Sequence, residues 1–311
     1  MPNIHEATLI GLDWGTTSLR AHLIGSDGVI LKTLSSPDGI LSSEGKKFDE
    51  VFERIVGPWL KEKPNLPVIA SGMITSRNGW LETPYLQLPA CVSDFANALT
   101  KFKVSDNQNI HFVTGTSYEN ELGAPDIMRG EETQIIGLMP ENKNKFEVYL
   151  LPGTHSKWAV AEDGKIKSFM SYMTGEVFAL LTNHSILGTL MSENKSPLSD
   201  GFLRGVKTRI QSDASLLHQV FSARTLTLFD QLPNNEISDY LSGILIGEEV
   251  KSAKHNLNID VSQKVQIIGR GDLTMRYSLA LNEVQIAHDL ANEHAAAMGL
   301  YKIAIKAGII K

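Results

Sequence analysis

The sequence predicts an α/β protein built from two lobes. Its 311 residues exceed the usual size of one domain, about 100 to 200 residues. A pattern of short apolar strands opens the chain and returns near residue 147, and stretches with helical spacing follow each occurrence. We therefore expect one lobe over residues 1–139 and the other over 140–311, with the polar run 140–145 as a hinge between them.

In the first lobe, turn residues separate apolar runs that are too short for helices. The expected strands are 8–12, 18–24, 29–35, 68–70 and 110–113. The segment 46–60 has one apolar stripe at helical spacing, so it is expected to be a helix with one buried face. A second helix is expected from Gly130 to Leu138, and the loop 71–79 is polar.

In the second lobe, the opening pattern is repeated. Strands are expected over 147–151, 158–161 and 166–171, with Asp163-Gly164 as a hairpin turn. Helices are expected to dominate from Gly175 onward. A short strand at 265–268 interrupts them, and an alanine-rich helix over about 287–307 closes the chain.

The composition indicates which classes of binding partner and which cellular compartment to expect. A formal net charge of −6 disfavours nucleic acids and anionic membranes as partners, so an anionic substrate would need local cations. The single cysteine, Cys91, excludes an intramolecular disulfide and thiolate-rich zinc sites. With no secretory signal and no apolar run of membrane-spanning length, the expected location is cytoplasmic. Composition leaves a homo-oligomer open.

Residues 13–20, Asp-Trp-Gly-Thr-Thr-Ser-Leu-Arg, lie between two strands and form the first motif whose residue types suit ligand binding. Such a hairpin presents backbone N–H groups and small hydroxyls to phosphate oxygens, while Asp13 can hold Mg²⁺ through water. The alternative is a plain hairpin turn capped by Asp13. The residues predicted to contact the nucleotide are Gly15, Thr16, Thr17, Ser18 and Arg20.

Residues 151–158, Leu-Pro-Gly-Thr-His-Ser-Lys-Trp, form a second hairpin in the repeated strand unit. Gly153 and Thr154 are predicted to approach the phosphates, and the alternative is a structural Pro-Gly turn. Lys157 is either a phosphate ligand or a solvated strand residue. Gly269 follows a strand and opens a helix, where backbone can lie against a nucleotide.

Four strings carry a family resemblance. Asp-x-Gly-Thr-Thr-Ser-x-Arg resembles the first phosphate motif of the actin, hexokinase and Hsp70 superfamily, especially of its carbohydrate kinases. The stretches at 12–21, 71–74, 129–134 and 151–158 resemble the 2-dehydro-3-deoxygalactonokinase family, and the similarity extends toward the C-terminus. One departure is Pro152, since the wider superfamily often has Asp before this glycine.

The resemblance implies a fold, a reaction and cofactors. It implies two ribonuclease-H-like lobes with mixed sheets around an interlobe ATP cleft. It also implies transfer of the ATP γ-phosphate to the 6-hydroxyl of 2-dehydro-3-deoxy-D-galactonate, with ATP and Mg²⁺ as cofactors. The superfamily has its adenosine motif near the position of Gly269.

Glu131 and Glu132 are the candidate catalytic acids, together with Asp13. The run Gly130-Glu131-Glu132 is similar to a Gly-Asp-Gln motif of glycerol kinase and its relatives, which supplies the base for the sugar hydroxyl. We favour Glu131 because it directly follows Gly130. The alternative is that both acids only favour the dipole of a helix that begins there.

Ser76, Arg77 and Asn78 are the candidate substrate-binding residues in the polar loop. The Arg77 guanidinium can bind a sugar-acid carboxylate through two parallel hydrogen bonds. Related sugar kinases have an arginine in a comparable loop. The alternative is a surface arginine paired with a nearby acid.

Three other functions fit parts of the pattern. A kinase of another sugar or sugar acid fits all the motifs. A nucleotide-dependent regulator would bind ATP without a sugar, but we expect no appended peptide-binding domain and the Arg77 loop favours a small substrate. A polyphosphate phosphatase would need a basic channel. The sequence does not determine which sugar acid is used, which glutamate is the base, or the kinetic constants.

Overall fold

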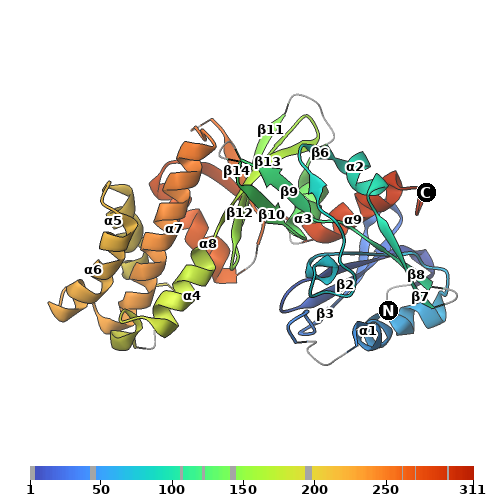
Figure 1. Ribbon diagram of the computed structural model, residues 1–311, viewed down its shortest axis with the longest axis horizontal. Helices are drawn as coiled ribbons and strands as arrows, with labels where there is room; N and C mark the ends of the chain where they lie inside the picture. Colours follow the sequence, from blue (N-terminus) through green and yellow to red (C-terminus); the bar gives the residue numbers. More distant parts are fainter. Residues whose placement is uncertain are drawn as a thin grey trace. The chain divides into compact units, whose positions relative to one another are not determined.

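The computed structural model describes residues 4–42, 47–105, 108–120, 123–140, 145–192, 198–260, 262–269, 271–292 and 294–311. Two predicted features therefore lie outside the described residues: the start of the first helix at 46 and the centre of the hinge at 141–144. The chain forms two compact units (Figure 1). The first comprises Met1–Phe146, Ala161–Ser168 and Asn292–Lys311, and the second comprises Glu147–Val160 and Phe169–Ala291.

The first unit is built on a mixed six-stranded sheet in the order β3-β2-β1-β4-β8-β7. Its strands are β1 (Ala7–Trp14), β2 (Leu19–Gly25), β3 (Ile30–Ser36), β4 (Val68–Ser71), β7 (Thr100–Ser105) and β8 (Gln108–Phe112). The first three strands are antiparallel, which confirms the predicted strand unit. β4 is parallel to both β1 and β8. The carboxyl ends of β1, β4 and β8 therefore meet at one edge.

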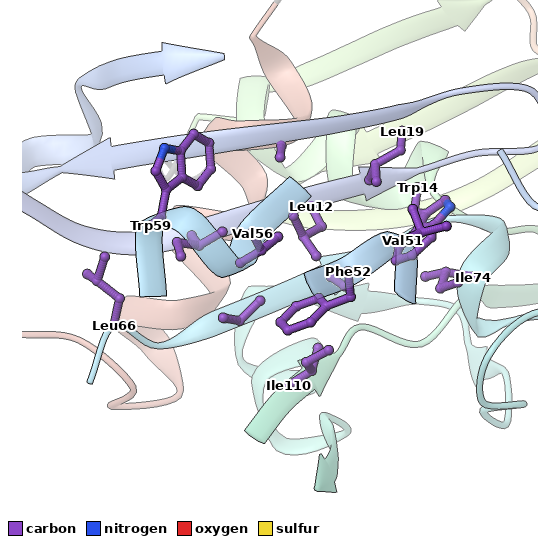
Figure 2. Close-up of a cluster of buried hydrophobic side chains, with 14 of the residues drawn as sticks. Leu12, Trp14, Leu19, Val51, Phe52, Val56, Trp59, Leu66, Ile74 and Ile110 are labelled. Carbon is purple, nitrogen blue, oxygen red and sulfur yellow. The ribbon is translucent and has the colours of Figure 1, made fainter. Parts of the chain in front are cut away.

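A helix covers one face of this sheet through the apolar stripe that its sequence predicts. α1 (Phe48–Glu62) buries Val51, Phe52, Val56 and Trp59. Figure 2 shows these side chains packed against Leu12, Trp14, Leu19 and Ile110 of the sheet and against Leu66 and Ile74. The core thus extends to Trp14 and Ile74, two residues that adjoin the first hairpin and the polar loop. Apolar packing anchors both motifs.

The rest of the first unit leads the chain toward the acidic motif. A small sheet has the order β10-β9-β5, formed by β5 (Leu86–Gln87), β9 (Thr116–Glu119) and β10 (Pro125–Met128). The helices are α2 (Val92–Asn97), α3 (Glu131–Leu138) and the C-terminal α9 (Ala295–Lys306). α3 and α9 lie very close, since a Cβ added to Gly299 would be 1.8 Å from the carbonyl oxygen of Thr133. The end of the chain therefore belongs to the first unit.

The second unit contains most of the remaining sheet, whose order is β15-β14-β11-β12-β13-β6. Its strands are β11 (Phe146–Leu151), β12 (Ser156–Glu162), β13 (Lys165–Tyr172), β14 (Lys264–Ile267) and β15 (Ala287–Leu290). β14 is parallel to both β11 and β15. β6 (Ala90–Cys91) pairs with β13 at Lys165–Ile166, within the part of β13 that groups with the first unit.

Helices make up the rest of the second unit, as the sequence predicts (Figure 1). They are α4 (Thr174–His184), α5 (Asp200–Ile210), α6 (Leu216–Leu228), α7 (Ile237–Asn256) and α8 (Gly271–Glu283). α7 is buried along most of its length and contributes to two apolar clusters. One cluster lies against the sheet and includes α8, and the other lies among α4, α6 and α7.

The structure corrects two predicted boundaries. The alanine-rich helix predicted over about 287–307 is wrong in its first part, because Ala287–Leu290 forms β15 and the helix begins at Ala295. Backbone pairing with β14 outweighs the intrinsic helix propensity of this segment. The turn predicted at 13–17 begins later, because β1 continues through Trp14 and pairs with Leu19 of β2.

Candidate active site

The first predicted phosphate hairpin, Gly15–Ser18, is held by its backbone. The Gly15 amide donates to the Ser18 carbonyl at 2.9 Å, and the amides of Ile40 and Leu41 donate to the carbonyls of Gly15 and Thr16 at 3.1 Å each. A Cβ added to Gly39 would lie 2.3 Å from the carbonyl oxygen of Thr16, so the two chain segments are in direct contact. Thr16, Thr17 and Ser18 are exposed. Their hydroxyls can therefore reach a ligand.

Asp13 lies at the end of β1, directly before this hairpin, and is 7% exposed. Its carboxylate pairs with Arg20 Nη2 at 2.7 Å, because the two residues are cross-strand neighbours in β1 and β2. A single carboxylate beside a phosphate hairpin suits Mg²⁺, which usually takes one or two protein carboxylates, substrate phosphates and several waters. The residues present thus fit the predicted metal.

Three motifs far apart in the sequence meet beside Asp13. β1 and β4 are parallel, and their register places Ser71 opposite Asp13. Gly72 has φ +100°, and a Cβ there would lie 2.6 Å from the Trp14 carbonyl oxygen. Gly130 has φ +113°, and a Cβ there would lie 3.0 Å from Gly72 Cα. Only glycine fits at such close backbone approaches, so the first hairpin, the polar loop and the acidic motif converge within one unit.

The polar loop after β4 folds into a compact turn. It includes the 3-10 segment η3 (Met73–Thr75), and the Ser76 hydroxyl donates to the Met73 carbonyl at 2.7 Å. Ser76 is 9% exposed, whereas Arg77 and Asn78 are exposed. Within the described residues, the Arg77 guanidinium makes no ion pair. It is therefore open to an anionic ligand, while the Ser76 hydroxyl is already engaged.

The two candidate acids of α3 differ in their surroundings. Glu132 is fully buried, and its two carboxylate oxygens accept the Gly130 amide at 2.9 and 2.8 Å. Burial, with a smaller effect of the Glu131 charge, raises the pKa of Glu132 to about 8. Glu131 is half-buried, and its carboxylate accepts the Arg129 amide at 3.0 Å. Only Glu131 has surface that a substrate could touch.

Arg129 is a residue that the sequence analysis assigned no role. It is 8% exposed, and its Nη1 donates to the hydroxyls of Thr75 and Thr83 at 2.8 Å each. Its guanidinium carbon lies 4.3 Å from the centre of the Tyr85 ring. Arg129 therefore ties the polar loop to the acidic motif. The available signal was an arginine directly before Gly130-Glu131, but nothing local indicated which residues it would contact.

The second predicted hairpin, in the second unit, lies against the start of α4. A Cβ added to Gly175 would be 2.5 Å from the Gly153 carbonyl oxygen, and the Glu176 amide donates to the Thr154 carbonyl at 3.0 Å. The side chains of His155 and Glu176 also form a hydrogen bond. Thr154 is exposed. The hairpin thus presents its loop to solvent while α4 supports one side of it.

The other two predicted nucleotide-binding residues of the second unit lie close to this hairpin. Lys157 is 6% exposed and donates to the Ser171 hydroxyl of β13, so it is not the solvated strand residue that one alternative expected. β14 runs parallel to β11, and Gly269 follows it at the same sheet edge. A Cβ added to Gly269 would lie 3.6 Å from the Pro152 ring. Gly269 therefore adjoins the second hairpin.

Sequence comparison identifies the family. The sequence model of the 2-keto-3-deoxy-galactonokinases matches residues 13–303, which include both hairpins, the polar loop and the acidic motif. The chain belongs to the 2-keto-3-deoxy-galactonokinase family. It is 35% identical to the 2-dehydro-3-deoxygalactonokinase of Escherichia coli strain K12 over 88% of this chain and 89% of that protein. It is 30% identical to a probable 2-dehydro-3-deoxygalactonokinase of Rhizobium meliloti strain 1021, over 87% of each chain.

Solved structures confirm the fold expected for a member of this kinase family. A putative 2-dehydro-3-deoxygalactonokinase from Sinorhizobium meliloti superposes with a TM-score of 0.86 at 28% identity, covering 95% of this chain and 98% of that one. The activator of 2-hydroxyisocaproyl-CoA dehydratase from Clostridium difficile, solved with bound ADPNP, has a TM-score of 0.51 at 13% identity over 97% and 96% of the chains. This second likeness concerns the fold alone.

No helix in the described part of the chain has the length and apolar character needed to cross a membrane.

Proposed function

We propose that this chain transfers the γ-phosphate of ATP to the 6-hydroxyl of 2-dehydro-3-deoxy-D-galactonate. The observation that carries this proposal is the backbone convergence of Trp14, Gly72 and Gly130. It brings an aspartate suited to Mg²⁺, a loop with an open arginine and a half-buried glutamate into one region of a member of this kinase family. These are the groups that phosphoryl transfer to a sugar acid needs.

In the proposed reaction, the 6-hydroxyl oxygen attacks the γ-phosphorus. A new P–O bond to the sugar acid forms, the bond from the γ-phosphorus to the β,γ-bridging oxygen breaks, and ADP leaves. Glu131 accepts the hydroxyl proton, since Glu132 has no exposed surface. Mg²⁺, when bound, neutralises charge on the phosphates. Asp13 would hold the ion through water or directly.

The remaining predicted residues have binding roles in this proposal. Arg77 binds the carboxylate of the sugar acid, with Ser76 and Asn78 beside it. Both hairpins contribute backbone amides and small side chains to nucleotide binding, and Gly269 lies near the nucleotide. The nucleotide contacts proposed are Gly15, Thr16, Thr17, Ser18, Arg20, Gly153, Thr154, Lys157 and Gly269. We also propose a cytoplasmic location, where ATP and Mg²⁺ are available.

A coupled assay of ADP release tests the proposal. The purified chain is mixed with MgATP and a panel of sugar acids that includes 2-dehydro-3-deoxy-D-galactonate, its gluconate epimer and non-keto aldonates. The expected result is ADP release that depends on the galactonate compound, with one phosphate found on its 6-oxygen by NMR. Faster turnover of another sugar acid would change the substrate. ADP release that is the same without any sugar acid would contradict a kinase.

A further inference from the structure

Beneath the second hairpin lies a buried carboxylate that the proposed reaction does not use. Glu249 of α7 is 1% exposed. Its Oε1 accepts the Trp158 indole N–H at 2.8 Å, and its Oε2 accepts the Tyr277 hydroxyl at 2.6 Å. The hydroxyls of Ser156 and Thr174 lie close to this carboxylate and favour its charged form. Burial raises its pKa, and no cation in the described part of the chain pairs with it.

The partners of Glu249 come from the segments that hold the hairpin. Ser156 directly follows the hairpin loop at the start of β12, and its hydroxyl also lies 2.8 Å from that of Tyr277 in α8. Thr174 begins α4, and the next two residues contact the carbonyls of Gly153 and Thr154. One buried side chain therefore connects both ends of the hairpin's support.

A buried carboxylate is costly, and it is tolerated where several donors satisfy it. One of the two donors here is the Tyr277 hydroxyl, which also bonds with the Ser156 hydroxyl and could turn elsewhere if the carboxylate were absent. Without it, the Tyr277 hydroxyl that bonds with Ser156 would lose its acceptor, and the hairpin that ends at Ser156 would gain freedom. Pre-ordered backbone amides are what make such a loop an effective phosphate site.

We propose that Glu249 is a positioning residue for nucleotide binding, which acts through Ser156, Thr174 and Tyr277 to hold the second hairpin in its phosphate-binding conformation. This inference rests on the proposed function only in taking the ligand of the hairpin to be a nucleotide phosphate. Glu249 itself touches no substrate.

Two tyrosines of the second unit provide a matched test. Tyr277 and Tyr240 are each 1% exposed, and the hydroxyl of each lies 2.8 Å from a serine hydroxyl. The Tyr240 hydroxyl bonds with Ser222 of α6. The Tyr277 hydroxyl bonds with Ser156, at the end of the second hairpin, and with Glu249. Tyr277→Phe and Tyr240→Phe remove the same group from similar surroundings. Glu249→Gln replaces one acceptor oxygen with an amide nitrogen at nearly constant volume.

The measurements are the dissociation constant of MgADP by calorimetry, the KM values for ATP and sugar acid, and a thermal melt. Tyr277→Phe and Glu249→Gln are expected to weaken MgADP binding and raise the KM for ATP about tenfold, as loss of a buried hydrogen bond implies. The KM for the sugar acid should change less than about twofold, and Tyr240→Phe should lower the melting temperature similarly without changing nucleotide binding.

The outcomes separate this inference from the proposed function. If Tyr277→Phe binds MgADP as tightly as the unmodified chain, the positioning role is wrong even if the melting temperature falls. If both tyrosine variants weaken nucleotide binding equally, the effect is general destabilisation and the inference also fails. MgADP binding needs no sugar acid, so a chain that binds it normally but phosphorylates none of the panel refutes only the proposed substrate. Should Glu249→Gln not fold, Tyr277→Phe alone decides.

Discussion

Backbone contacts support both predicted phosphate hairpins, and the second also depends on buried side chains. The first, Gly15–Ser18, is bound to the segment 39–41 by backbone hydrogen bonds and by close approach of Gly39. The second, Gly153–Ser156, is supported by the start of α4 and by the buried side chains around Glu249. The first also follows an acidic residue, Asp13, where the second follows Pro152.

This difference has consequences for mutation. A hairpin held by backbone tolerates most side-chain changes but not a new Cβ at a close approach. A hairpin that is also held by buried side chains is sensitive, in addition, to single changes far away in sequence, as at Glu249. Of the two hairpins, the first alone directly follows a carboxylate, that of Asp13, which suits Mg²⁺. The rate of phosphoryl transfer should therefore depend more on the first hairpin, whereas nucleotide affinity should depend on both.

Asp13→Asn should have the largest effect, because it removes the charge that would hold Mg²⁺ at the first hairpin. We expect kcat to fall by on the order of a thousandfold, since several kcal/mol of transition-state charge stabilisation depend on the ion. Asp239→Asn is the control: Asp239 is also buried and pairs with Arg276 Nη2 at 2.6 Å, but it belongs to the second unit, whereas Asp13 belongs to the first. Near-normal turnover of Asp13→Asn at saturating Mg²⁺ would refute the assignment.

Glu131→Gln should have the next largest effect. A positioned base contributes at least about a hundredfold in many enzymes, so kcat should fall by about that factor while the KM for ATP stays constant. The pH profile of kcat/KM should also lose its acidic limb. Rate and pH measurements on Glu131→Gln and Glu132→Gln decide between the two acids, and a larger loss of kcat in Glu132→Gln with normal stability would reverse the assignment.

Gly39→Ala and Gly175→Ala test the comparison directly, because each disturbs one hairpin. The new Cβ would lie 2.3 Å from the Thr16 carbonyl oxygen in the first case and 2.5 Å from the Gly153 carbonyl oxygen in the second. Both backbones must shift, so we expect the KM for ATP to rise roughly tenfold or more, with a lower melting temperature. Gly25→Ala is the control, since its nearest contact would be an ordinary 3.4 Å. If the KM for ATP of all three variants equals that of the unmodified chain, neither hairpin binds the nucleotide.

Glu132 should affect stability in a pH-dependent way. Its pKa is raised to about 8 from an ordinary value of 4.5, so the folded state holds a proton that the unfolded state releases. The contribution of this proton to the free energy of unfolding is fully present below pH 4.5. It falls by a few kcal/mol as the pH rises toward 8. Urea denaturation between pH 5 and 8 should show a steeper decline for the unmodified chain than for Glu132→Gln. Parallel curves would contradict the raised pKa.

Arg77→Ala should have the smallest effect. The exposed guanidinium contributes a charge-assisted contact in high dielectric, so the KM for the sugar acid should rise about tenfold with little change in the KM for ATP. Arg77→Lys should rescue little, because lysine lacks the paired donors. If both KM values rise together, Arg77 contacts phosphate or supports the loop instead.

Local pattern was sufficient for most of the secondary structure. From Gly175 onward only a mainly helical region was predicted, whereas the strand unit from Ala7 to Ser36 and the helix α1 follow from apolar spacing and turn residues. The strand at Ala287–Leu290 does not follow from local pattern, because pairing with β14 outweighed its helix-favouring composition. Strand pairing is a long-range contact that composition does not encode.

The candidate site shows the same limit. Asp13, Glu131, Gly153 and Arg77 stood out because each lies in a motif of characteristic residue types. Arg129 and Glu249 did not stand out, since their importance arises from partners 28 to 91 residues away. The choice between Glu131 and Glu132 also depended on burial, which adjacent positions at a helix start do not reveal.

By itself, the sequence determined the family, the two hairpins and most of the elements, because these depend on residue type, short spacing and local turn chemistry. Only the tertiary structure decided that α9 packs on α3, that Trp14, Gly72 and Gly130 meet, and that Glu132 is buried while Glu131 is not. These outcomes depend on the register of parallel strands and on backbone approaches that few sites permit. Such contacts are set by the packing of the whole unit.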